Sequence, residues 1–343
     1  MSVGYGAVGW NRQKKIYDAT LVAGLLLFFA VFVGLGLKLW PHATIETMLI
    51  RAFGVSAFLL LHVILCTGPL ARLDRRFLPI LYNRRHLGVT MCLLACAHAV
   101  FGIVQFHSLG VLSPLVNVLA GDGSFASLSH WPFQVFGAAA LIVLIVMAAT
   151  SHDFWLATLT APVWKAMHML VYVAYALLVA HVAFGIGQTG RGAWFAVATG
   201  VGAVVVCSLH LVAALRERRG DAEKSAGQEG WIEVGPVESF TDKRARVICA
   251  AGERIAVFFY EGKFSAVSSV CQHQNGPLGE GRIIDGCITC PWHGYQYVPE
   301  TGASPPPFTE AVPTFRVQVR NSRVFVDPRP LPPGTRVEPA KVR

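Results

Sequence analysis

The sequence predicts an all-α bundle of six membrane-spanning helices followed by a small all-β domain. The chain has 343 residues, is 54% hydrophobic and is only 14% charged, well below the charged share of an ordinary soluble protein. Nearly all long apolar runs lie before residue 216, and short β-type runs rich in Gly, Pro and charge follow. The expected parts are a membrane domain at 1–215, a linker at 216–230, a β domain at 231–328 and a tail at 329–343.

Six stretches have the length of about 20 apolar residues that a helix needs to cross a bilayer. They are residues 19–39, 49–70, 87–106, 133–150, 163–187 and 193–214. The loop 71–86 carries five arginines and 215–219 carries three, whereas 107–132 has no Lys or Arg. Because basic residues favour cytoplasmic loops, both termini and the β domain are expected in the cytoplasm. The basic residues behind the net charge of +9 thus lie beside the apolar spans. This distribution indicates a membrane-lipid environment and no nucleic acid partner.

Histidines at membrane depth stand out in the apolar half, because ionisable groups are costly there and indicate function. Measured along the helix from the basic residue at the cytoplasmic end of each span, His98 lies about 20 Å deep and His181 about 24 Å deep. Two imidazoles facing each other at matched depth are what a six-coordinate b-type haem needs. His168 lies near the cytoplasmic edge and is a candidate for a second haem or a flavin. The alternative, polar residues hydrogen-bonded between helices, is favoured for His62.

The β half carries two Cys/His motifs, C-Q-H at 271–273 and C-P-W-H at 290–293. They place one thiolate and one imidazole on each of two tight loops, so the predicted ligands are Cys271, His273, Cys290 and His293. Two cysteines on one iron and two histidines on the other make a Rieske-type [2Fe–2S] centre. A zinc site is the competing interpretation, because Cys287 and Cys290 form a C-x-x-C pair. The surrounding β pattern favours the cluster and leaves Cys287 as a buried strand residue.

Alternating apolar residues in the β half predict antiparallel hairpins. Two dipeptides between such runs, Glu261-Gly262 and Asn321-Ser322, have the composition of hairpin turns. Gly and Pro residues beside both Cys/His motifs supply the turns that bring the two ligand loops together.

Residues 45–190 resemble the ferric-reductase-like transmembrane domain. The marks of this resemblance are TGPLAR at 67–72, the opening NRRHLG of the third span, and W-x-x-x-H at 164–168 with a second histidine at 181. The likeness is greatest to the haem-binding membrane subunit of the bacterial methionine sulfoxide reductase system. It implies haem b held by His98, His168 and His181, and electron transfer across a bacterial inner membrane. Members with two histidines on each ligand helix hold two haems; here the third span has only His98 at depth, so one or two haems are expected.

Residues 231–328 resemble the Rieske ferredoxin family through CPWHGYQY and TGASPPP. Quinol-oxidising Rieske proteins carry an extra cysteine in each loop and a serine after C-x-x-H-G. Here Asn275-Gly276, Trp292 and Tyr295 stand at those positions. The missing serine hydroxyl implies a low cluster potential, with Tyr297 as the remaining candidate donor. A complete oxygenase would need a further non-haem iron domain, for which the residues after 328 are too few.

The two resemblances together imply a membrane electron-transfer protein. A flavoprotein reductase or ferredoxin in the cytoplasm is expected as donor, since no G-x-G-x-x-G turn follows a strand. Electrons would pass from the cluster to haem b and on to an acceptor such as a quinone, ferric iron or a periplasmic protein. Two alternatives stay open, a ferric or quinone reductase with its own acceptor site and a redox sensor or assembly factor. No catalytic residue is assigned, and whether the chain is itself an oxidoreductase enzyme stays open.

Overall fold

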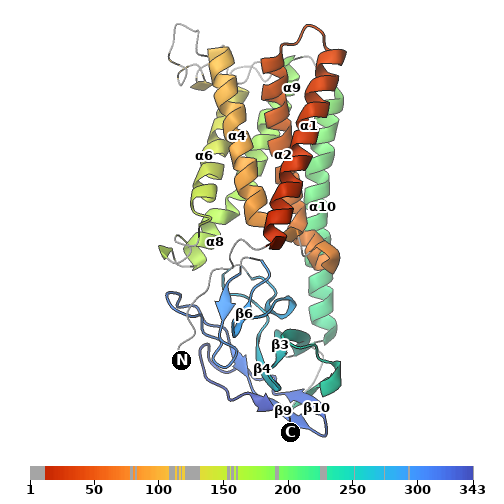
Figure 1. The fold of residues 1–343 in the computed structure, drawn as a ribbon, viewed down its shortest axis with the longest axis vertical. Coiled ribbons are helices and arrows are strands. Elements are labelled where there is room, and N and C mark those ends of the chain that lie inside the picture. Colours follow the sequence, from red (N-terminus) through yellow and green to blue (C-terminus); the bar gives the residue numbers. More distant parts are fainter. Residues whose placement is uncertain are drawn as a thin grey trace. The chain divides into compact units, whose positions relative to one another are not determined.

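The structure is a computed structural model of the chain, and it forms two compact units. The residues that it describes are 12–77, 80–81, 83–107, 113, 116, 118–119, 132–152, 155, 158–159, 161–189, 193–224, 230–250, 252–273, 275–292 and 294–342. One unit is helical and takes in Trp10–His152 and Ala166–Leu211. The other is built around Val212–Arg343. Each unit is described by itself below (Figure 1).

Long apolar helices make up the N-terminal half (Figure 1). They are α1 Arg12–Leu39, α2 Ile45–Leu73, α4 Arg84–His107, α6 Phe133–Ala149, α8 Ala161–Met169, α9 Val171–Thr189 and α10 Ala193–Lys224. Each predicted span is found as a helix, and the fifth is broken at Leu170 into α8 and α9. Among the described residues five helices are long and apolar enough to cross a membrane, while α6 has 17 residues. The protein is therefore an integral membrane protein, as predicted.

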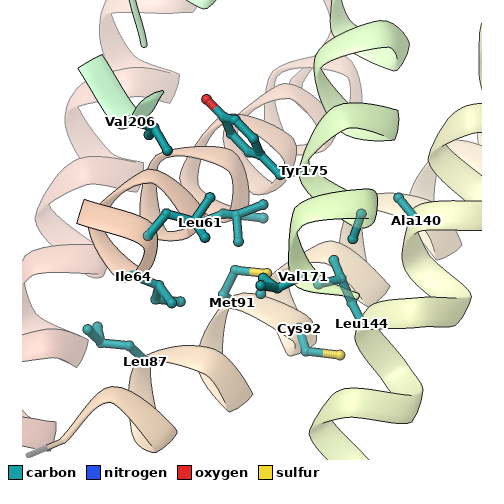
Figure 2. Close-up of a cluster of buried hydrophobic side chains, with 13 residues drawn as sticks. Leu61, Ile64, Leu87, Met91, Cys92, Ala140, Leu144, Val171, Tyr175 and Val206 are labelled. Atoms are coloured by element: carbon teal, nitrogen blue, oxygen red, sulfur yellow. The ribbon is translucent and has the colours of Figure 1, made fainter. Parts of the chain in front are cut away.

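The helical core is built by two helix pairs, α2 with α4 and α6 with α9. Figure 2 shows Leu61 of α2 and Leu144 of α6 in one cluster with Val171 and Tyr175 of α9. In a bilayer helices associate by close packing, because lipid tails are as apolar as leucine. Consistent with this, the small residue Ala140 is fully buried within the same cluster.

The C-terminal half is a small antiparallel β domain, as predicted. Its strands are β1 Ile232–Pro236, β2 Arg244–Ala250, β3 Glu253–Tyr260, β4 Lys263–Ser268, β5 Arg282–Ile284, β6 Cys287–Thr289, β7 Gln296–Tyr297, β8 Thr314–Phe315, β9 Val317–Arg320, β10 Arg323–Val326 and β11 Ala340–Lys341. They form sheets of order β1-β10-β9, β11-β4-β3-β2 with β8 beside β4, and β5-β6-β7. A core of buried aliphatic and aromatic side chains from the first two sheets holds the domain together.

Two-residue hairpin turns set the register of these sheets. Glu261 and Gly262 have φ of 49° and 70° and join β3 to β4, with Tyr260 opposite Lys263. Asn321-Ser322 joins β9 to β10 in the same way, with φ of 48° and 56°. Positive φ at both central residues gives the turn that matches strand twist. Both predicted hairpin turns are confirmed.

The segment expected as a separate tail, 329–343, packs onto the β domain instead. Strand β11 pairs with β4, which places Ala340 opposite Phe264. Thr314 on β8 donates from its hydroxyl to the Thr335 carbonyl at 2.8 Å. The segment is rich in proline and poor in alternating apolar residues, so its sequence does not predict a strand. Its backbone hydrogen bonds, rather than a buried apolar face, attach it to the domain.

The β core predicts a clear difference between two aliphatic truncations on adjacent strands. Ile255 on β3 is fully buried, whereas Val247 on β2 is 36% exposed. Ile255→Ala should cost about 2–5 kcal/mol because it leaves a cavity, which lowers the melting temperature by ~10 °C or more. Thermal loss of the visible circular dichroism of the full-length protein measures this. Val247→Ala is the control, and equal melting temperatures for both variants would contradict the core assignment.

Candidate functional site

The two loops that carry the Cys/His motifs share one backbone construction. The first spans Cys271–Gly276 and the second spans Cys290–Tyr295. In the first loop the Cys271 N–H donates to the Gly276 carbonyl at 2.9 Å, and the Asn275 N–H donates to the Cys271 carbonyl at 2.7 Å. In the second loop the Cys290 N–H donates to the Tyr295 carbonyl at 2.8 Å, and the Gly294 N–H donates to the Cys290 carbonyl at 3.0 Å. Asn275 and Gly294 occupy the same place in their loops, and their φ angles are 57° and 75°. Asn and Gly are the residues that tolerate this left-handed conformation, so the sequence closes both loops identically.

Close contact between the two loops depends on Gly276. A Cβ atom at this position would lie 2.7 Å from the Cys290 sulfur and 3.2 Å from the Trp292 ring. Any side chain would therefore push the second loop away from the first. Cys271 and Cys290 are both buried, so the loops present two sheltered thiols from facing turns.

The imidazole of His273 completes the described part of this site. It is buried, and its ring stacks on Tyr295 with centroids 5.3 Å apart and planes 8° apart. The Tyr295 hydroxyl donates to the Glu310 carboxylate, which fixes the stacking partner. Two thiols and an imidazole on paired loops are ligand types that a Rieske [2Fe–2S] cluster requires. His293 lies outside the described residues, within which no group of three or more metal-ligating side chains gathers; the four-ligand set stays a prediction.

A tyrosine hydroxyl lies against one of the two loop cysteines. The Tyr297 oxygen accepts the Gln272 N–H at 3.0 Å and lies 3.4 Å from the Cys271 sulfur, to which it can donate. Burial, together with the charge of the Cys271 thiolate, raises the pKa of Tyr297 well above its ordinary value. The hydroxyl therefore keeps its proton and can stabilise charge on the sulfur.

Cys287 is a buried strand residue, as predicted. It opens β6 and is 1% exposed. Burial raises the pKa of its thiol to about 11, and the carboxylates of Glu300 and Asp285 add to the shift. Zinc binds cysteine as thiolate. The place of Cys287 inside a strand, rather than on either Cys/His loop, favours the structural role over the competing zinc interpretation.

In the helical unit, His98 and His181 are brought together. Their ring centroids lie 6.3 Å apart and their planes cross at 81°. His98 Nδ1 lies 2.9 Å from the Ile50 carbonyl, and His181 Nδ1 lies 2.9 Å from the Phe133 carbonyl. Because a carbonyl can only accept, each Nδ1 carries the proton and each Nε2 keeps a lone pair for a metal.

The spacing of the two rings fits an iron held between them. Metal–imidazole bonds are about 2 Å long and the ring centre lies about 1 Å behind the nitrogen, so a shared metal needs centroids about 6 Å apart. The observed 6.3 Å agrees with this. The residues present therefore suit a haem with two axial histidines.

Two glycines at this site were not predicted from the sequence. A Cβ at Gly54 would lie 2.9 Å from His98 Nδ1, and one at Gly137 would lie 2.7 Å from His181 Nδ1. Each imidazole thus lies against a helix backbone that has no side chain in its way. The sequence signal that could have identified them is the pattern Phe-Gly-x-x-Ala, which occurs at 53–57 and again at 136–140.

The other intramembrane histidines have different surroundings. His62 Nε2 lies 3.0 Å from the Tyr175 hydroxyl and its Nδ1 donates to the Phe58 carbonyl at 2.8 Å. This is the interhelical hydrogen bonding favoured for His62. His168, on α8 before the break at Leu170, has its Nε2 3.4 Å from the Ser151 hydroxyl.

Comparison with protein families identifies the class of each half. Residues 230–316 match the family model of the Rieske [2Fe-2S] domain. Residues 53–179 match the model of the ferric reductase like transmembrane component. The chain therefore joins a Rieske ferredoxin-like electron-transfer domain to a ferric-reductase-like membrane component, and its general activity is electron transfer.

Individual relatives cover only part of this chain. It is 31% identical over 98 residues to the anthranilate 1,2-dioxygenase ferredoxin subunit of Burkholderia cepacia, across 28% of this chain and 91% of that protein. It is 29% identical over 102 residues to cholesterol 7-desaturase nvd 1 of Ciona intestinalis, across 29% of this chain but 22% of the desaturase. The structure of the ferredoxin of carbazole 1,9a-dioxygenase from Nocardioides aromaticivorans IC177 aligns with a TM-score of 0.28 and 21% identity, over 29% of this chain and 100% of that one.

Removing the Tyr297 hydroxyl should lower the midpoint potential of the cluster. Tyr297→Phe deletes a hydrogen bond of about 1 kcal/mol to the sulfur, equivalent to about 40 mV for a one-electron couple. Redox titration followed by EPR measures the change. Tyr260→Phe is the control, because its hydroxyl contacts Ser265 and Glu300. An unchanged potential in Tyr297→Phe would contradict the proposed donor.

Replacing Cys287 should leave the metal centre intact. Cys287→Ala removes a buried thiol that is protonated at neutral pH, so iron content and the EPR signal of the reduced cluster should match wild type. Cys290→Ala should lose both. If Cys287→Ala instead loses its metal, or if the purified protein holds zinc in place of iron, the C-x-x-C interpretation is correct.

Proposed function

We propose that this protein carries electrons from a cytoplasmic donor through its β domain to a haem b between His98 and His181, and on to an acceptor in or beyond the membrane. The observation that carries the proposal is the pair of imidazoles 6.3 Å apart, each with Nδ1 on a backbone carbonyl. When bound, the [2Fe–2S] cluster and the haem each supply a one-electron redox couple.

In the β domain the proposed ligands are Cys271, His273, Cys290 and His293. The protein's own contribution is to hold both cysteines in buried loops and to place the Tyr297 hydroxyl against the Cys271 sulfur. This single hydroxyl donor, without the serine of quinol-oxidising proteins, supports a low potential. A low potential suits an entry point that receives electrons from a ferredoxin or a flavoprotein reductase.

In the membrane the hydrogen bonds from His98 and His181 to backbone carbonyls make the imidazoles more basic. A more basic ligand favours the oxidised iron, so these bonds pull the haem potential down towards that of the cluster. His168 remains a candidate for a further cofactor, haem or flavin, nearer the cytoplasmic edge. It precedes His181 in the same predicted span by about 20 Å along the helix axis, and a site there would shorten the distance from cluster to haem.

The arginine distribution supports a bacterial inner-membrane protein with both termini and the β domain in the cytoplasm. The resemblance to the membrane subunit of the methionine sulfoxide reductase system favours a periplasmic protein as acceptor, with quinone and ferric iron as the others to test. Reduction of the cluster without net electron flow to any acceptor would support a redox sensor or assembly factor instead.

Histidine variants test this proposal directly. Purified protein reduced with dithionite should show the α-band of haem b, and His98→Ala and His181→Ala should each lose it. His62→Ala is the matched control, since His62 is also within the membrane but is bonded to Tyr175; it should keep the band.

Stopped-flow absorbance then measures transfer between the two centres. Reduced ferredoxin should reduce the haem in wild type but not in Cys271→Ser. Absence of the haem band in wild type, or haem reduction that does not need the cluster, would refute the proposed path.

A further inference from the structure

The two helix pairs of the membrane domain carry the same sequence pattern, repeated at one constant offset along the chain. Phe-Gly-x-x-Ala-x-x-x-Leu occurs at 53–61 and again at 136–144. Ala-His-x-x-Phe-Gly-Ile-x-Gln occurs at 97–105 and again at 180–188. The first pattern lies on α2 and α6 and the second on α4 and α9. The step from 53 to 136 equals the step from 97 to 180, so the two halves correspond without insertion or deletion.

Equivalent residues also make equivalent contacts. Phe53 stacks on Phe101 with centroids 5.6 Å apart and planes 12° apart. Their counterparts Phe136 and Phe184 stack at 5.7 Å and 17°. Within each pair the two residues come from different helices, so this agreement reflects two helix pairs packed in the same way.

A polar contact repeats as well. The Thr67 hydroxyl donates to the Val63 carbonyl at 2.6 Å, and the equivalent Thr150 donates to Val146 at 2.7 Å. Both threonines are buried. The equivalent positions thus carry the same residue with the same bond, although Thr20 and Thr199 elsewhere in the helices make this bond as well.

The histidine site obeys the same offset. The carbonyls of Ile50 and Phe133 accept from His98 and His181 at 2.9 Å, and the two glycines beneath the rings, Gly54 and Gly137, are equivalent positions of the two repeats. Each half therefore contributes one carbonyl, one glycine and one imidazole. With two helices in each unit, the repeats run in the same direction, so the site lies on a pseudo-two-fold axis between them.

We infer that the membrane domain is a tandem duplication of a two-helix unit, and that Gly54 and Gly137 are positioning residues that hold two haem-ligating imidazoles with crossed planes. The inference rests on the proposed haem. Each ring is held by two constraints, the Nδ1–H···O=C bond and the bare helix surface at glycine. A methyl group at either glycine would crowd the ring, at 2.9 Å from His98 Nδ1 or 2.7 Å from His181 Nδ1, so the ring must tilt.

The duplication also limits the number of haems. The residue of the first repeat that corresponds to His168 is Arg85. A guanidinium remains protonated and has no lone pair for iron. The inner position therefore lacks a second histidine at the equivalent residue, so one haem per chain is expected, and flavin is then the cofactor left for the inner position beside His168.

Crossed imidazoles have a spectroscopic signature. In low-spin ferric haem, parallel ligand planes separate the two iron d orbitals that share the unpaired electron, and the EPR signal is rhombic. Planes that cross near 81° leave those orbitals almost equal in energy, and the signal becomes strongly anisotropic with one dominant low-field feature. The oxidised [2Fe–2S] cluster is EPR-silent, so it does not obscure the haem.

The experiment is EPR of the oxidised full-length protein with haem content from the pyridine haemochromogen. Wild type should contain one haem b per chain with the strongly anisotropic signal. Gly54→Ala and Gly137→Ala should each move the signal towards the rhombic form, by similar amounts because the sites are equivalent. Gly34→Ala on α1 and Gly200→Ala on α10 are the controls, since nothing lies within 4 Å of a Cβ at either position; both should match wild type.

The outcomes separate this inference from the proposed function. Absence of haem b in wild type contradicts both. Haem b with a rhombic wild-type signal, or with two haems per chain, overturns the inference and leaves electron transfer standing. Wild-type signals in both Gly54→Ala and Gly137→Ala overturn the positioning role. Loss of haem from those two variants alone, with both glycine controls retaining it, supports that role.

Discussion

The membrane half depends on one interaction, the hydrogen bond from a histidine Nδ1 to a backbone carbonyl of the neighbouring helix. His98 makes it to Ile50 and His181 makes it to Phe133, both at 2.9 Å. The bond crosses from α4 to α2 and from α9 to α6, so it joins each helix to its main packing partner. It also fixes the tautomer, which leaves Nε2 as the only metal donor. Helix packing and ligand chemistry are therefore set by the same atoms.

The β domain achieves a comparable result by a different means. Its ligand loops have no helix to position them, so each closes on itself through two backbone hydrogen bonds and a left-handed residue. Gly276 then allows the loops to touch, since a side chain there would meet the Cys290 sulfur. In both halves a glycine lies against a side chain of another segment that is proposed to bind metal. The shared requirement is close approach of backbone to ligand, which only a residue without Cβ permits.

Much of this could be predicted from the sequence, for identifiable physical reasons. Apolar length predicts the helices, and the turn composition of Glu261-Gly262 and Asn321-Ser322 predicts the hairpins. The number of residues between each histidine and the basic end of its helix predicts that His98 and His181 lie at similar depth in the membrane. The carbonyl partners could not be predicted, because any residue supplies a carbonyl and only packing selects which one. Strand β11 could not be predicted, because backbone hydrogen bonds attach it to the domain and the chain around it is rich in proline. Neither feature produces an alternating apolar pattern in the sequence.

The inferred duplication explains why the membrane site is symmetric at its centre and asymmetric at the end that carries Arg85 and His168. Gly54 with His98 and Gly137 with His181 are the same residue types at equivalent positions of the two halves. At the inner position the halves differ, with Arg85 in one and His168 in the other. Arginine near the end of a membrane helix favours the cytoplasmic side, in agreement with the proposed orientation. The proposed haem site is therefore symmetric in its imidazoles, carbonyls and glycines, while the ends of the two repeats differ in the side chain that they carry.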